Sequence, residues 1–182
     1  MTLYIAFLRG INVGGHRVKM EKLRELFREL GFSNVRTYIQ TGNVFFESPE
    51  TDCEVLTAQI EAHLLQSLGY EVPTFLRIPA KLEPSLQLDP FYEVEVTPDT
   101  RLMVVFTRES LQPSTPLPIV SAKTDMEIVA VTEGEVYLVI RLIDGKWGNL
   151  APFMKKAFGV NATITTRFYD TTLKILQAAQ DT

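Results

Sequence analysis

The stretch that decides the fold is "VRTYIQTGNVFFES", residues 35–48, which reads as two strands joined by a tight turn around Gly42. Helical patterns flank it. The segment "KMEKLRELFRELG" (19–31) has apolar residues at helical spacing, and a second stripe with that spacing is formed by Leu56, Ile60, Leu64 and Leu68. A strand, "TLYIAFLR" (2–9), precedes the first helix, and another, "VPTFLRI" (72–78), follows the second. This order predicts a split βαβ, or ferredoxin-like, unit.

The second half of the chain has a similar order of elements. Strands are predicted at "RLMVVFT" (101–107), "MEIVAVT" (126–132) and "EVYLVIRL" (135–142), then a helix at 150–159, a strand at 162–168 and a last helix. We therefore predict an α+β protein made of two tandem ferredoxin-like units with antiparallel sheets, residues 1–78 and 101–182. Residues 79–100 contain four prolines and five acidic residues against one lysine, and are predicted to be a linker with a short helix.

The composition limits the class of protein. The chain has 182 residues, 46% of them hydrophobic, and a net charge of −4, so a sizeable core is possible and a wholly basic nucleic-acid binder is not. One cysteine, Cys53, and two histidines give no disulfide and no recognisable metal site. We expect Cys53 to pack in the core. No signal peptide and no apolar run of about 18 residues is present, so a cytoplasmic protein without a membrane partner is expected.

The candidate site follows the first predicted strand, in "FLRGINVGG" (7–15). Gly10 and Gly15 have the spacing of a P-loop, but His16 and Arg17 stand where Lys and Ser or Thr are required, so an NTPase P-loop is excluded. A loop between a strand and a helix can still present N–H groups to an anion. Between Met1 and Phe46 there are seven Lys or Arg residues and three Glu residues. The alternative is that the glycines serve only the turn.

The turn before the third strand is expected at the same edge of the sheet. Gln40 and Asn43 offer hydrogen-bond donors and acceptors there. The candidate ligand-binding residues are therefore Arg9, Asn12, Gly14, Gly15, Arg17, Lys19, Gln40 and Asn43. A secondary candidate group in the second half is Lys146, Trp147 and Arg167. Here the tryptophan would stack on the ring of a ligand. The alternative is a structural role, in which Trp147 packs at the edge of the core.

Four motifs of the chain resemble those of the uncharacterised DUF1697 family. They are "FLRGINVGG" (7–15), "TYIQTGNVFF" (37–46), "DGKWG" (144–148) and "TTRFYDTTLKI" (165–175). Where the family has two asparagines within the last motif, this chain has Phe168 and Asp170. The resemblance implies a duplicated ferredoxin-like fold and brings no established activity, catalytic residue or cofactor with it.

Three functional classes stay open from the sequence. The first is a binding protein for a phosphate-bearing ligand, a nucleotide or RNA, at the glycine-rich loop. The second is an enzyme acting on a small anionic substrate, and the third is a protein–protein interaction module. The consensus of RNA-recognition modules is absent from "TGNVFFES". The sequence does not decide whether the protein is an enzyme, and it indicates no oligomeric state.

Overall fold

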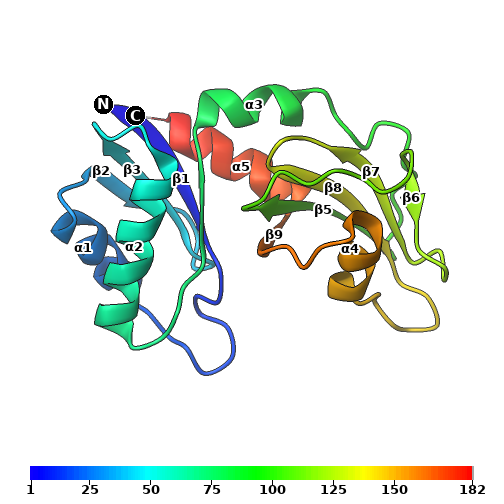
Figure 1. Cartoon of the computed structure of the whole chain (residues 1–182), viewed down its shortest axis with the longest axis horizontal. Coiled ribbons are helices and arrows are strands. Elements are labelled where there is room, and N and C mark those ends of the chain that lie inside the picture. Colours follow the sequence, from blue (N-terminus) through cyan, green and yellow to red (C-terminus); the bar gives the residue numbers. More distant parts are fainter. Residues whose placement is uncertain (182) are drawn as a thin grey trace. The chain divides into compact units, whose positions relative to one another are not determined.

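The computed structural model describes residues 1–181, which form an α+β fold with five helices and two antiparallel sheets of four and five strands (Figure 1). The fold class predicted from the sequence is confirmed. The chain divides into two compact units, Met1–Glu83 together with residues 175–181, and Pro84–Lys174. None of the helices within residues 1–181 is long and apolar enough to cross a membrane.

The first unit has the predicted order of elements. They are β1 (Thr2–Leu8), α1 (Met20–Glu29), β2 (Ser33–Thr37), β3 (Asn43–Ser48), α2 (Cys53–Leu68) and β4 (Thr74–Arg77). The strand order in the sheet is β2-β3-β1-β4, and all pairings are antiparallel. This is the strand order of a split βαβ unit, so β1 lies in the middle of the sheet and its end lies beside the start of β3.

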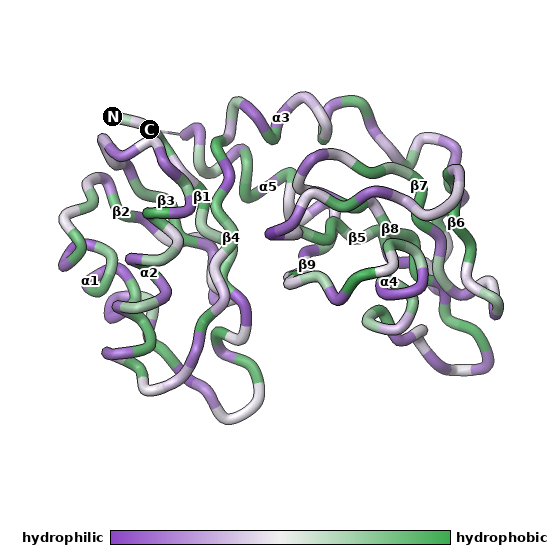
Figure 2. Tube along the Cα trace, viewed as in Figure 1, coloured by the Kyte–Doolittle hydropathy of each residue, from purple (hydrophilic) through white to green (hydrophobic). Residues whose placement is uncertain are grey.

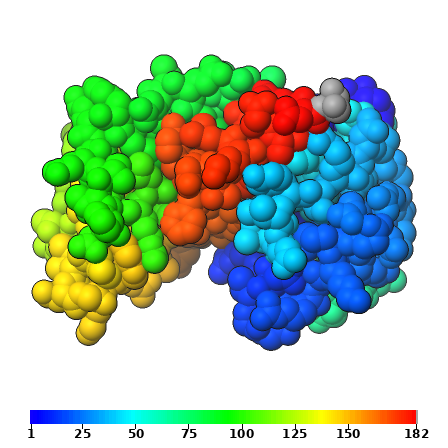
Figure 3. All heavy atoms as spheres, turned by 180° about the vertical axis from the view of Figure 1, so that it is seen from behind, coloured from blue at the N-terminus to red at the C-terminus, as the bar shows by residue number. Residues whose placement is uncertain are grey.

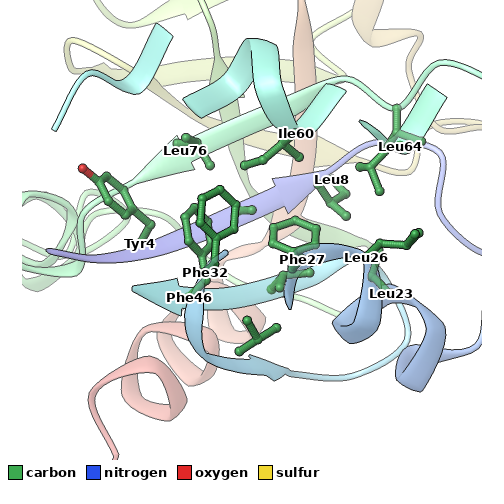
Figure 4. Packing of buried hydrophobic residues seen from close by; sticks show 14 of the residues in the cluster. Tyr4, Leu8, Leu23, Leu26, Phe27, Phe32, Phe46, Ile60, Leu64 and Leu76 are labelled. Carbon is green, nitrogen blue, oxygen red and sulfur yellow. The ribbon is translucent and has the colours of Figure 1, made fainter. Parts of the chain in front are cut away.

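One face of this sheet carries the core of the first unit. Phe27 from α1 and Ile60 from α2 pack against residues of β1 and β3 (Figure 4). The ring of Phe46 lies 4.4 Å from that of Phe32 and 5.3 Å from that of Tyr4, between ring centroids. In Figure 2 both helices show hydrophilic and hydrophobic colours along their length, as expected when only one side of a helix is buried.

The opposite face of the first sheet receives the end of the chain. Arg36 on β2 lies over the ring of Phe45, with 5.2 Å between the guanidinium carbon and the ring centroid. Its nitrogens donate hydrogen bonds to the carbonyl oxygens of Ala178 at 2.9 Å and Ala179 at 3.0 Å. These alanines belong to α5 (Tyr169–Gln180), so the last turns of this helix belong to the first unit.

This grouping differs from the predicted domain boundaries, which placed all of 101–182 in one unit and 79–100 in a linker. Residues of that linker form α3 (Pro79–Gln87), and both α3 and α5 contain a boundary between the compact units. Local sequence patterns could not predict that the last turns of α5 belong to the first unit, because the hydrogen bonds of Arg36 join residues separated by more than a hundred positions.

The second unit has a five-stranded sheet of order β6-β7-β8-β5-β9. Its elements are β5 (Thr100–Thr107), β6 (Ile119–Val120), β7 (Met126–Val131), β8 (Glu135–Arg141), α4 (Leu150–Phe158) and β9 (Ile164–Phe168). Without β6 this order matches that of the first sheet, but the described residues between β5 and β7 contain a short strand and no helix. The predicted duplication of a ferredoxin-like unit is therefore not confirmed.

The start of α2 corrects one expectation. Asp52 is the N-cap residue, and its carboxylate accepts hydrogen bonds from the N–H groups of Glu54 and Val55 at 2.9 and 3.3 Å. Cys53, the first residue of the helix, is exposed, so the prediction that it packs in the core was wrong. The first buried residue of α2 is Leu56. The helix therefore begins before it reaches the core, and Cys53 lies in this exposed start.

Candidate functional site

The loop between β1 and α1 contains three residues with positive φ. These are Gly10 at 78°, Asn12 at 57° and Gly14 at 60°. Figure 1 shows the loop extending beyond the end of β1, and in Figure 3 its blue atoms lie at the lower edge of the surface. A Cβ atom built on Gly14 or on Gly15 would have no other atom within 4 Å. The tip of the loop is therefore open, and its glycines satisfy no packing requirement.

Asn12 closes the loop on itself. Its side-chain oxygen accepts a hydrogen bond from the N–H of Val18 at 2.8 Å, and its side-chain nitrogen donates to the carbonyl of Val18 at 3.2 Å. The same nitrogen donates to the carbonyl of Gln40 at 2.9 Å. Asn12 and Gln40, both predicted site residues, therefore do meet. However, the amide of Asn12 is engaged in holding the loop in shape.

The turn between β2 and β3 is packed tightly under this loop. A Cβ on Gly42 would lie 3.1 Å from the Cβ atoms of both Leu8 and Ile11. Asn43 is fully buried, and its amide nitrogen donates to the carbonyl of Tyr38 and the hydroxyl of Thr41. Asn43 thus shapes the turn from inside, whereas the exposed residue of this turn among the candidates is Gln40.

The cations of the loop are exposed and carry no ion pair. Within residues 1–181, no carboxylate lies within ion-pair distance of the predicted site residues Arg9, Arg17 and Lys19. Arg17 donates one hydrogen bond to the carbonyl of Asn12 at 3.3 Å. The neighbouring α1 is different, because its three cations all pair with glutamates of the same helix, at residues 21, 25 and 29.

A ring contact that the sequence did not predict supports the loop. The ring of His16 lies against that of Tyr70, which follows α2, with 3.8 Å between centroids and an angle of 31°. His16 stays exposed, whereas the hydroxyl of Tyr70 is buried and has no hydrogen-bond partner among the described residues. Burial raises the pKa of Tyr70 above its ordinary value. An aromatic residue just beyond the helix-ending Gly69 was the only local signal for this contact.

The secondary candidates each have contacts that the sequence did not predict. Trp147 is partly buried, and the guanidinium of Arg101 lies over its ring, 3.8 Å from the centroid. Arg167 on β9 is buried, donates to Thr165 and Thr166, and has its pKa lowered to about 10 by burial. Lys146 is exposed and pairs through its backbone with Ile143. The partner of the tryptophan is thus Arg101, more than forty positions earlier.

The sequence and fold can now be compared with known proteins. The model of a family described as "Protein of unknown function (DUF1697)" matches residues 1–137, which include the whole glycine-rich loop and the first sheet. The chain belongs to the DUF1697 family. This DUF1697 protein is also similar to a solved structure, described as that of a conserved bacterial protein from Streptococcus pneumoniae. The TM-score is 0.70 at 22% identity, and the match covers 100% of this chain and 99% of the other.

The likeness to the streptococcal protein shows a shared fold, and at this identity it carries no function. No match was found among curated proteins. The chemistry of this DUF1697 protein is therefore argued from its own residues. Its loop combines unpaired cations with two exposed glycines whose N–H groups donate no hydrogen bond to a described residue, and these groups are suited to holding an anion.

Proposed function

We propose that this protein binds a phosphate-bearing ligand, a nucleotide or RNA, at the loop between β1 and α1. The observation that carries the proposal is the contrast between unpaired and paired cations. Arg9, Arg17 and Lys19 lie beside the open glycines without a carboxylate partner, while the cations of α1 are all paired. Like charges without counter-charges favour the approach of an anion.

Hydrogen bonds within the protein reduce the number of candidate groups that can contact a ligand. The amides of Asn12 and Asn43 are engaged within the protein, so we assign them to the frame of the site. The binding groups proposed are the side chains of Arg9, Arg17 and Lys19 and the N–H groups of Gly14 and Gly15. These two N–H groups donate no hydrogen bond to any described residue. A guanidinium matches two phosphate oxygens at once, which makes the two arginines the main contributors.

The exposed ring of His16 offers a surface on which a nucleotide base can stack. One face of its ring lies on Tyr70, and the residue is exposed. Bases stack on aromatic rings with about 1–3 kcal/mol per base. Because the charged groups are exposed, we expect weak binding that falls as the salt concentration rises. The chain has a single cysteine and needs no oxidising compartment, so the cytoplasm is the proposed location.

The test is an NMR titration of the full chain at low salt with inorganic phosphate, AMP, ATP and a short single-stranded RNA. We expect shifts confined to residues 9–19 and 40, with ATP or RNA exceeding phosphate because they add charges and a base. Arg9→Gln and Arg17→Gln should each weaken binding about tenfold, the value of one charged hydrogen bond. Lys22→Gln removes the same charge from α1 and serves as the control.

Three outcomes would overturn the proposal. One is the absence of shifts with all four probes, and another is equal loss of binding in Lys22→Gln and Arg17→Gln. The third is binding that does not change with salt. Conversion of ATP or RNA to product during the titration would instead indicate an enzyme, the alternative left open by the sequence.

A further inference from the structure

The second unit contains a pocket of about 390 Å³ between the β6–β7 hairpin and α4. Its walls are largely apolar. Ile119 and Met126 contribute from the hairpin side, and Phe153 and Ala157 from the helix. This size and this lining are typical of sites for small organic molecules, which combine apolar walls with a few polar groups. None of the residues predicted from the sequence as binding residues lies in it.

One carboxylate in this pocket is almost fully buried. Asp125, directly before β7, is 9% exposed. Its Oδ1 accepts a hydrogen bond from the hydroxyl of Ser121 at 2.6 Å. The same hydroxyl oxygen accepts from the N–H of Met126 at 2.9 Å, so the position of Ser121 is fixed from both sides. Asp125 is therefore held rigidly by the hairpin.

The second oxygen of this carboxylate has no partner. Among residues 1–181, no group donates a hydrogen bond to Oδ2, and neither of the pocket's lysines, Lys123 and Lys156, forms an ion pair with it. Oδ2 is not one of the fully enclosed polar atoms without a partner in residues 1–181, so it keeps some access to solvent, and Asp125 lines the pocket. A carboxylate oxygen that has no donor within the protein and is accessible can accept hydrogen bonds from a bound group.

The backbone of Gly148 passes close to this oxygen. A Cβ on Gly148 would lie only 2.6 Å from Oδ2 of Asp125 and 2.9 Å from Cε of Met126. The backbone of Gly148 is not in the left-handed region, so its conformation does not by itself require glycine. What requires glycine at this position is the close approach of its backbone to the carboxylate, which leaves no room for a side chain.

We propose that this pocket binds a small molecule with an apolar body and one protonated amine, whose N–H groups donate to Oδ2 of Asp125. A carboxylate attracts a cation and repels an anion, and these interactions are stronger in a partly enclosed pocket than in open water. Lys123 and Lys156 are exposed, so water already solvates their charges. Both lysines line the pocket, and their positive charges disfavour a ligand that carries more than one amine. This proposal is independent of the site on the first unit.

The test uses three probes of one shape with the full chain: phenethylamine, phenethyl alcohol and 3-phenylpropionate. In an NMR titration at millimolar concentration, phenethylamine should shift the signals of Ser121, Asp125, Asn149 and Phe153. It should bind about tenfold more tightly than the alcohol, as expected for a charged hydrogen bond over a neutral one. Equal affinity for amine and alcohol, or tighter binding of the acid, would overturn the proposal, as would no pocket shift with any of the three.

Two variants and one control complete the test. Asp125→Asn keeps the acceptor for Ser121 but removes the charge, and should weaken phenethylamine binding about tenfold while leaving the alcohol unchanged. Asp144→Asn removes the same charge from an exposed position and should change neither. Ala122→Phe adds bulk at an exposed residue of the pocket and should weaken all binding without disturbing the core. If phenethylamine binds equally to Asp125→Asn and the wild type, the assignment fails.

Discussion

The side chain of Asn12 joins the loop after β1 to the turn before β3, through a 2.9 Å hydrogen bond from its Nδ2 to the carbonyl oxygen of Gln40. Two more bonds connect the same amide with Val18. The bond to Gln40 spans 28 positions of the sequence, so it brings together two motifs that are separated by a helix and a strand. Asn12 is thus the residue of the frame that connects the loop with the turn.

Replacing Asn12 by alanine should therefore destabilise the first unit by about 2–3 kcal/mol, from lost hydrogen bonds and from the cost of alanine at positive φ. Asn34→Ala is the matched control, because Asn34 also has positive φ but its amide makes one exposed bond, to Glu47. The control should lose only about 1 kcal/mol. Urea unfolding measures both, and equal losses would show that the bonds of Asn12 add no stability.

Gly42→Ala tests the close packing of the β2–β3 turn. Its φ of 82° matches the 83° of Gly69, so any alanine pays a similar conformational cost at both sites. Only at Gly42 would the new Cβ meet other atoms, at 3.1 Å, whereas Gly69 has none within 4 Å. Gly42→Ala should cost about 1–3 kcal/mol more than Gly69→Ala, the usual range for overpacking. Thermal unfolding of the two variants should separate them clearly, and similar melting temperatures would contradict the packing argument.

Two tyrosines with raised pKa values should respond in opposite ways to removal of their hydroxyl. Tyr70→Phe should stabilise the protein by about 1 kcal/mol, because the hydroxyl is buried without a partner. Tyr4→Phe should destabilise it by about 1 kcal/mol, because Tyr4 donates to the carbonyl of Glu50 at 2.8 Å. Denaturant unfolding at neutral pH gives both values, and a loss of stability in Tyr70→Phe would mean that a donor or acceptor reaches its hydroxyl.

The pH dependence of the Tyr70 variant follows from the direction of the pKa shift. Burial raises the pKa of Tyr70 in the folded state above 10.0, so the unfolded chain ionises first. The stability that comes from keeping this phenol neutral is present below pH 10 and is lost as the pH rises through the folded pKa. The advantage of Tyr70→Phe over the wild type should therefore grow in alkaline solution. A constant difference across this range would contradict the shift.

Glu21 should make the first unit sensitive to acid. Hydrogen bonds from Arg24 and then Arg28 lower the pKa of Glu21 below 4.5. Its contribution to stability is thus present above the unfolded pKa of about 4.5 and is lost as the pH falls through the lower folded value. Glu21→Gln should reduce stability at neutral pH, and the difference from wild type should vanish in acid and in high salt.

Glu25→Gln is the control for that variant, because Glu25 pairs with one lysine at 3.7 Å. Its effect on stability at neutral pH should be smaller, because it removes one long ion pair. Circular dichroism melts at several pH values give the comparison. If the two glutamine variants lose stability to the same extent at every pH, the double pairing of Glu21 has no energetic role.

The sequence by itself determined the elements of the first unit and the position of the open loop. Apolar spacing and the glycines at 31 and 69 act within a few residues, so α1, α2 and the strands of the first sheet could be predicted from local pattern. The same local reading placed Arg9, Arg17 and Lys19 beside the glycines. It could not show whether these cations were paired or free, since that depends on where carboxylates lie in space.

Only the tertiary structure decided how the polar groups are used. In the folded protein the amide of Asn12 donates to the carbonyl of Gln40, and Arg101 lies over the ring of Trp147. Cys53 is exposed, and Gly148 lies next to Asp125. Apart from the exposure of Cys53, each of these relationships joins residues that no helical or strand period connects. Hydrogen bonds and ring contacts depend on distances of a few ångströms, which are set by packing between elements and leave no periodic signal in the chain.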